Sequence, residues 1–267
     1  MIASLLARNY RSTQRLLAVI GERAAPADLP PELDGVEADF SEALQDALAG
    51  LYRAPIREGF DGMPDTSVED ITLWLLGRFA KHPEWTDDVQ RVLTDWLTDA
   101  VHLGVSDGLE LIDGPAAAES LTDAELVKTL EDRAAMLAGM GRNPSLVQTT
   151  VREMSSELLI ALAAGLALGV ALAALGDKRA PVRAITIAAT ETVWGVNAGR
   201  LAAFRKNGVT HVRYRVNPGA CAQCLPYNGR SYAIPPSLTI PLHPHCRCAW
   251  EPDLSGWSPP KSWWTGR

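Results

Sequence analysis

The chain has 267 residues, of which 47% are hydrophobic, so it is neither too short nor too polar to bury a substantial core. Its formal net charge of −7 is unevenly distributed, because residues 177–267 hold twelve of the 25 Lys and Arg but only four of the 32 Asp and Glu. That segment therefore carries about +8 and residues 1–176 about −15. The split indicates different partners for the two parts, with nucleic acid or an acidic protein suiting the basic one, or else two solvated surfaces of opposite sign.

Up to about residue 206 the apolar residues recur at helical spacing. A first helix is expected on Ile2, Leu5, Leu6, Leu16, Leu17 and Ile20, before the prolines at 26, 30 and 31 break the chain. The later helices are expected at 36–51, at 67–79 behind Ser67, from Thr86 to about 101, from a Thr122/Glu125 capping box, from Asn143 and Pro144 to Gly176, and from Pro181 to about 207.

One uncharged run of eighteen residues, 158–175, reaches the lower limit of a membrane span. Gly165 and Gly169 form a GxxxG pair, which allows close helix packing in a membrane or in a protein core. The flanking segments are amphipathic and there is no second such run, so a buried helix is favoured and no membrane is expected. Residues 1–22 mix three arginines among apolar residues, which is unlike a secretory leader.

The pattern changes after residue 206. Residues 211–216 alternate and are rich in β-branched and aromatic side chains, which predicts a strand, and "GRSYAI" and "CRCAWEP" are further candidate strands. Asn228-Gly229 is a turn signal. The sequence thus predicts a mainly α chain, α+β overall, with a helical body at 1–206, a small zinc-stabilised β module at 207–254 and a Trp-rich tail at 255–267.

All four cysteines fall within this module, as Cys221-Ala-Gln-Cys224 and, some twenty residues later, His243-Pro-His-Cys246-Arg-Cys248. Two donors separated by two residues can face one ion from a single turn, and Zn²⁺ takes four tetrahedral nitrogen or sulfur ligands. The predicted set is Cys221, Cys224, His243 and Cys246, with a four-cysteine set that includes Cys248 as the alternative. Both sets are complete, which favours a structural zinc. Two disulfides are the competing interpretation and would need an oxidising compartment.

These motifs, taken in order, resemble the phage Mu F-like minor head proteins, the phage head morphogenesis family. The resemblance covers roughly 181–252 and rests on three segments: "RAITIAATETVWGVNAGRLAAFRKNG", "CAQC" followed by "NGRSY", and "HPHCRC". The chain departs from the family at 217–220, where an acidic residue often precedes the first cysteine. The first 180 residues match only in being helical.

The resemblance implies a virion or assembly protein without enzymatic activity. Such a minor capsid protein lies inside the head near the portal vertex, having passed through the host cytoplasm, and helps head assembly or DNA packaging and exit. The implied partners are the portal protein and the major capsid or scaffold protein, with weak contact to genomic DNA.

Basic side chains interleaved with tyrosines in the module predict a surface for phosphate or for an acidic portal face. The expected basic patch consists of Arg200, Arg205, Lys206, Arg213, Arg215, Arg230 and Arg247, with Tyr214, Tyr227 and Tyr232 among them. Trp257, Trp263 and Trp264 of the tail either pack back on the body or dock on a partner. Arg183, Glu191 and Arg247 are expected to be structural, with Glu191 paired to Arg183 or Arg247 so that their helix holds the zinc module.

No phosphate-binding glycine loop, GxSxG or HExxH occurs in the sequence. The alternatives to a capsid protein are a zinc-binding nucleic-acid-binding protein and an HNH-like nuclease. A nuclease would need a second ligand set for its catalytic ion, and His211, His243 and His245 do not supply one convincingly.

Overall fold

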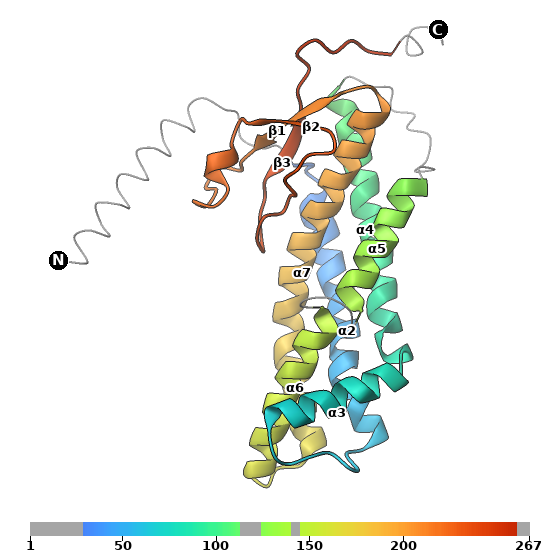
Figure 1. Cartoon of the computed structure of the whole chain (residues 1–267), viewed down its shortest axis with the longest axis vertical. Coiled ribbons are helices and arrows are strands. Elements are labelled where there is room, and N and C mark those ends of the chain that lie inside the picture. Colours follow the sequence, from blue (N-terminus) through green and yellow to red (C-terminus); the bar gives the residue numbers. More distant parts are fainter. Residues whose placement is uncertain (1–28, 113–123, 140–144, 261–267) are drawn as a thin grey trace, which may run out of the picture. The chain divides into compact units, whose positions relative to one another are not determined.

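The computed structural model describes residues 29–112, 124–139 and 145–260. Six α-helices precede a small three-stranded antiparallel sheet, which confirms the mainly α fold with a small β part near the C-terminus (Figure 1). The helices are α2 (Leu33–Glu58), α3 (Val68–Lys81), α4 (Glu84–Glu110), α5 (Ala124–Ala138), α6 (Leu146–Ala163) and α7 (Leu168–Lys206). The strands are β1 (His211–Arg215), β2 (Ser231–Ala233) and β3 (Ala249–Pro252), with a short 3₁₀ turn, η1 (Leu225–Tyr227), between β1 and β2.

Helix starts follow the expected side-chain chemistry where they are described. Ser67 caps α3 as predicted, because its hydroxyl accepts a hydrogen bond from the backbone N–H of Asp70. Helix α6 begins at Leu146 behind a Ser145 cap, two residues after the predicted Asn143–Pro144 start. The predicted helix at 2–20, the Thr122 cap and the Asn143–Pro144 pair lie outside the described residues.

The prediction of one helix from 143 to Gly176 is wrong. Helix α6 ends at Ala163, and Gly165 adopts a left-handed φ of 65° that a residue with a side chain rarely takes. The N–H groups of Gly165 and Leu166 bond to the carbonyls of Leu162 and Ala161, which is a Schellman motif. The uncharged run at 158–175 is therefore divided between two helices. None of the helices in the described ranges is long and apolar enough to span a bilayer.

Helix α7 continues through Gly176 and Pro181, although Gly176 was predicted to end one helix and Pro181 to begin the next. A Cβ at Gly176 would lie 2.8 Å from the Cβ of Tyr52, so this glycine permits close approach of α7 and α2. Pro181 removes one helical hydrogen bond, which the packing of the flanking turns outweighs.

The described residues form two compact units by packing. Unit 2 comprises 34–99, 124–139 and 145–189, and is built from helices alone. Unit 1 comprises 29–33, 100–112 and 190–260, and therefore contains the ends of α4 and α7 together with the sheet.

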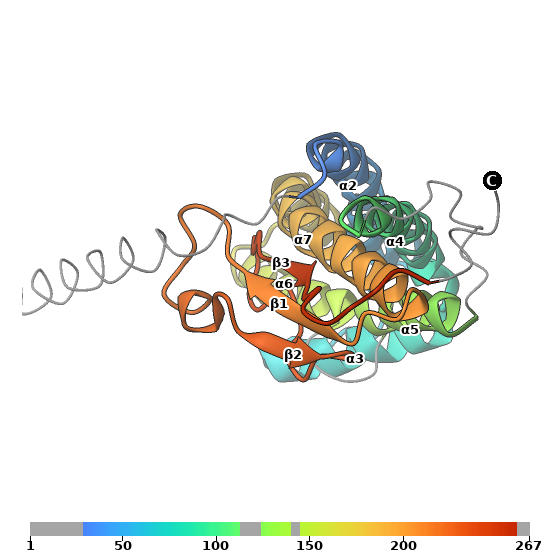
Figure 2. The same ribbon diagram turned by 90° about the horizontal axis from the view of Figure 1, so that it is seen from above.

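In unit 1 the C-terminal parts of α4 and α7 lie side by side (Figure 2), and glycines on both helices let their backbones approach closely. Gly104 and Gly108 of α4 adjoin Val196 and Arg200 of α7, while Gly195 and Gly199 of α7 adjoin Ala100 and Val101 of α4. A Cβ at Gly104 would lie 2.1 Å from the carbonyl oxygen of Val196. The two helices therefore approach more closely than any other residue type would allow.

The sheet has the strand order β2-β1-β3, and both pairings are antiparallel. Val212 and Tyr214 of β1 are buried, whereas the residues on either side of them in the strand are more exposed. The strand therefore buries one face, as its sequence predicts. Trp250 of β3 is fully buried and makes edge-to-face ring contacts with Tyr214 and Tyr232. The core under the sheet is completed by Val193, Val196 and Phe204 of α7.

We predict that Gly199→Ala destabilises the protein by about 1–3 kcal/mol, because the new Cβ would lie 2.2 Å from the carbonyl oxygen of Val101. Gly77→Ala is the matched control, since nothing lies within 4 Å of a Cβ at that exposed α3 position, and it should stabilise α3 by about 0.5–1 kcal/mol. Urea unfolding of the three proteins measures both effects. Equal stability of Gly199→Ala and wild type would contradict the close helix crossing.

Candidate metal centre

Two four-residue turns in unit 1 bring the predicted ligands together. The backbone N–H of Cys224 donates to the carbonyl of Cys221, and that of Cys246 donates to the carbonyl of His243. Each turn therefore carries one donor side chain at its first position and one at its last, which is the geometry that the two-residue spacing predicted.

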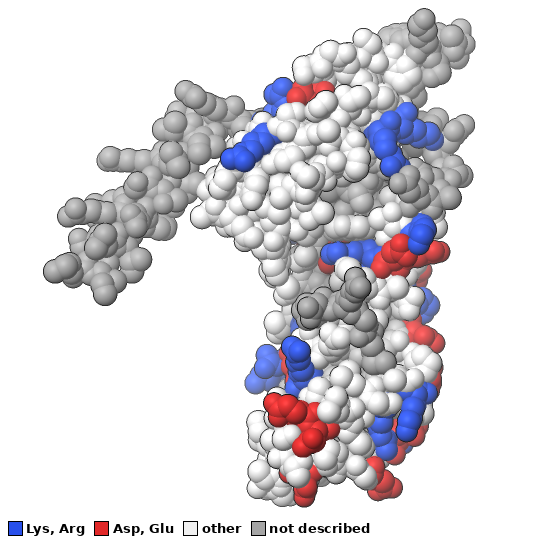
Figure 3. Space-filling model, viewed as in Figure 1, with Lys and Arg blue, Asp and Glu red and all other residues white. Residues whose placement is uncertain are grey.

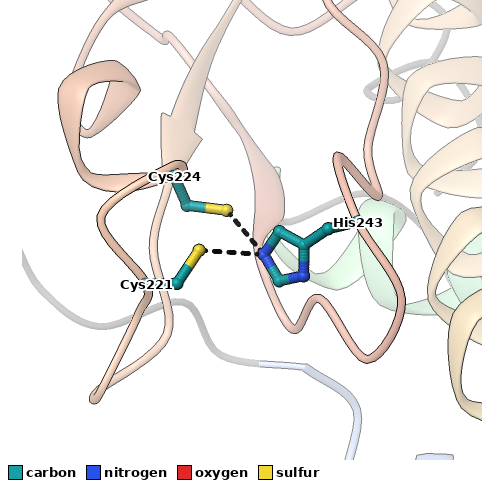
Figure 4. A group of neighbouring side chains, drawn as sticks. All are labelled: Cys221, Cys224 and His243. Atoms are coloured by element: carbon teal, nitrogen blue, oxygen red, sulfur yellow. Dashed lines mark hydrogen bonds between the residues drawn. The ribbon is translucent and has the colours of Figure 1, made fainter.

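The sulfur atoms of Cys221 and Cys224 each lie 3.1 Å from Nε2 of His243 (Figure 4). The other ring nitrogen, Nδ1, is 2.8 Å from the carbonyl oxygen of Pro244, to which it donates in the tautomer that leaves Nε2 bare. A second hydrogen bond of this kind is typical of metal-binding histidines, because it fixes the ring and directs one lone pair at the ion. The same carbonyl bond, more than any other contact, raises the pKa of His243.

Two overlapping groups of donor atoms could hold a metal ion, one made of Cys221, Cys224 and His243 and the other of Cys224, Cys246 and Cys248. Cys224 belongs to both, and its sulfur is 3.8 Å from that of Cys246. Tetrahedral Zn²⁺ with bonds of about 2.3 Å to sulfur places two sulfurs about 3.8 Å apart. The four cysteines are free thiols, so the structure contains neither of the two disulfides that were the competing interpretation.

The thiols of the cluster differ in acidity. The hydrogen bond from Cys248, aided by the backbone N–H groups of Cys248 and Leu242, lowers the pKa of Cys246 to about 5 despite its burial. Burial raises the pKa of Cys224 to about 12. Hydrogen bonding to Cys246 and burial also raise the pKa of Cys248. Partial burial opposes ionisation of Cys221, but N–H groups of Cys224 and Gln223 outweigh it and lower its pKa. A bound dication would favour the thiolate at every ligand position.

Tyr214 of β1 lies beside this cluster, whereas the sequence predicted it on the basic contact surface. Its buried hydroxyl adjoins the thiols of Cys224 and Cys248, yet it has no aligned hydrogen-bond partner among the described residues. Burial raises the pKa of the Tyr214 hydroxyl, so it stays protonated. A metal-bound thiolate is a stronger acceptor than a thiol, so this O–H fits a cluster whose sulfurs are ionised.

Helix α7 fixes the second turn and β3 through three polar side chains. The hydroxyl of Thr190 accepts from the backbone N–H of His245 at 3.2 Å. The amide of Asn197 donates to the carbonyl of Cys248 at 3.2 Å and accepts from the N–H of Trp250 at 2.7 Å, so it pairs with β3 as a further strand would. Arg200 donates to the Trp250 carbonyl and to the carboxylate of Asp107 on α4.

Several predicted contact residues are not on the surface. Arg200 has no exposed area, and Tyr214 is fully buried, so neither is available for DNA. Arg213 pairs with Asp253 at 3.0 Å and Arg215 with Glu251 at 2.5 Å, so their charges are largely compensated. Arg205, Lys206 and Arg230 do remain exposed. Figure 3 shows few charged side chains over the sheet on the face in view.

The remaining predicted residues are divided between the units. Trp257 packs on the unit 1 core and its indole N–H donates to the carbonyl of Asn207, so this part of the tail belongs to the fold. Trp263 and Trp264 lie outside the described residues. Glu191 is 4% exposed in unit 1, and Arg247 is half-buried there between Cys246 and Cys248.

Arg183 lies in unit 2 and does not hold the module. It donates to Tyr52, to Thr150 and to the carbonyl of Leu146, and it is 3.5 Å from Glu153. The prediction that Arg183 joins a network with the zinc module is therefore wrong, because its side chain is used to link α2, α6 and α7 within the helical unit.

Comparisons of the chain with protein-family models, with curated proteins and with solved structures find no match.

Proposed function

We propose that this protein is a phage minor capsid protein of the head morphogenesis type, acting near the portal in head assembly or in DNA packaging and exit. The observation that supports the proposal best is the meeting of the three motif segments in unit 1. Thr190, Asn197 and Arg200, all on the first segment, bond to the third segment or to Trp250 just after it. The third segment in turn shares the donor cluster with the CxxC turn.

We further propose that the ion is Zn²⁺ and that its ligands are Cys221, Cys224, His243 and Cys246. Thiolate and imidazole donors at tetrahedral spacing suit zinc better than the harder cations. The 3.1 Å contacts between sulfur and His243 Nε2 would open to about 3.6 Å around the ion. Cys248 stays outside the set and donates its hydrogen bond to the Cys246 sulfur.

A zinc with four protein ligands is structural and supplies folding energy. The module needs it because its strands are only five, three and four residues long, which gives little backbone pairing. In this proposal the module is a rigid platform rather than an active site.

The charges favour protein over DNA as the main partner. With Arg200 buried and Arg213 and Arg215 paired, the exposed cations of the predicted patch are Arg205, Lys206 and Arg230. Three phosphate contacts would give weak, strongly salt-dependent DNA binding. We propose the portal as the partner of this surface and the major capsid or scaffold protein as the partner of the acidic helices, inside the virion head.

For the metal we expect one zinc per chain in purified reduced protein. Cys224→Ser should abolish it, because Cys224 belongs to both donor groups. Cys246→Ser should weaken binding by at least tenfold, whereas Cys248→Ser should retain stoichiometric metal. Metal analysis and titration with Co²⁺, whose absorption reports the number of thiolate ligands, measure these outcomes. His211→Asn, an exposed histidine outside both groups, is the control. Retention of metal by Cys246→Ser and its loss from Cys248→Ser would instead establish the four-cysteine set.

For the function we expect the protein to elute as a defined complex with the portal protein encoded beside it when the two are co-expressed and separated by size-exclusion chromatography. Arg205→Glu combined with Lys206→Glu should weaken the complex, while Arg53→Glu on unit 2 should not. Separate elution of the wild-type proteins at low and moderate salt would contradict the portal proposal and leave the metal centre unaffected.

A further inference from the structure

A cavity of about 160 Å³ opens beside the donor cluster in unit 1. The lining consists of the loop 217–221 together with Cys224, His243, His245, Arg247 and Cys248. A space of this size has room for several waters, and therefore for a phosphate or a carboxylate group.

One side chain of the lining carries a permanent positive charge. No Asp or Glu is among the residues that line the cavity, and Arg247 supplies a guanidinium cation. A guanidinium has five N–H donors, so Arg247 can bind an oxyanion in addition to the contacts that it already makes. Two imidazoles on the same wall add further donors or acceptors.

The backbone holds this wall in an unusual conformation. His245 has a φ of 57°, the left-handed region, and it is the one residue other than glycine with positive φ in the described ranges. Such a conformation is unfavourable for a residue with a side chain and persists where its surroundings impose it. Here the bond from the His245 N–H to Thr190 on α7 does so. The strained residue therefore lies on the cavity wall with Arg247 only two residues away.

Part of the donor cluster also lines the cavity. Cys221, Cys224 and His243 line it, whereas Cys246 does not. A Zn²⁺ ion with three thiolate ligands and one neutral imidazole is net negative, so the positive charge that attracts an oxyanion comes from Arg247 and not from the ion.

We propose that this cavity binds one small oxyanion, a phosphate or a carboxylate group, with Arg247 as its charge partner. The proposal rests on the cavity and its lining, and it is independent of the portal partnership. It gives the module a binding function in addition to a structural one.

Inorganic phosphate is the first probe, titrated into the metal-loaded full chain at constant ionic strength and followed by ¹H–¹⁵N NMR. We expect saturable shifts confined to Gly219, Ala220 and Arg247, and competition by acetate. Arg247→Gln should weaken the binding at least tenfold. Arg230→Gln is the matched control, because that exposed guanidinium lies over the ring of Tyr227 and does not line the cavity. Equal effects of the two substitutions, or shifts that are spread over the surface and never saturate, would overturn the proposal.

A second measurement needs no variant and so remains decisive if Arg247→Gln fails to fold. In the Co²⁺-loaded wild-type protein, phosphate in the cavity lies close to a paramagnetic ion. The ³¹P relaxation rate should then rise well above that of the Zn²⁺ form, and acetate should reverse the rise. Relaxation that is the same in both metal forms would contradict binding at this cavity.

Discussion

Arg200 has no exposed surface, although a guanidinium in water is strongly solvated. Its burial is tolerable only because the carboxylate of Asp107 and the carbonyl of Trp250 replace that water. The three groups come from α4, α7 and β3, so one charged side chain joins these three elements of unit 1. Removing the Asp107 carboxylate would leave a buried charge unpaired, at a cost of about 3–5 kcal/mol.

The close helix crossing makes the contact possible. With glycines at 104, 108, 195 and 199, α4 and α7 touch backbone to backbone, and Arg200 on α7 can reach Asp107 on α4. Asn197, one turn earlier on α7, satisfies the backbone of β3. The helix therefore fixes the strand, the strand leads out of the turn that carries Cys246, and the sulfur of Cys246 lies beside that of Cys224 in the donor cluster. The cavity is lined in part by residues of this cluster, among them Cys221, Cys224 and His243.

The sequence predicted helices in the regions of α2 to α5, the three strands and the two donor-bearing turns, because each depends on local spacing. The α3 cap at Ser67 and the Cys221–Cys224 turn are examples, since a few neighbouring residues determine them. The sequence did not predict that Arg200 is buried or that Arg183 bonds within the helical unit, because both depend on partners about ninety to 130 positions away. The glycine pairs at 104/108 and 195/199 indicate the close helix contact by the same four-residue spacing as the pair at 165/169. Only the pair at 165/169 was interpreted as a helix-packing motif, and Gly165 instead follows the end of α6. Pro181 was predicted to begin a helix, but it lies inside α7, where the helix continues on both sides of it.

We propose that the two donor-bearing turns, the sheet and the ends of α4 and α7 form one cooperative unit. Hydrogen exchange of the full chain, resolved by residue and measured with zinc and after its removal by a chelator, tests this cooperativity. We expect the Trp250 amide and the amides of β1 to lose protection together on metal removal, while those of α3 and α6 in unit 2 keep theirs. Unchanged protection in β1 and at Trp250, or equal loss in both units, would contradict it.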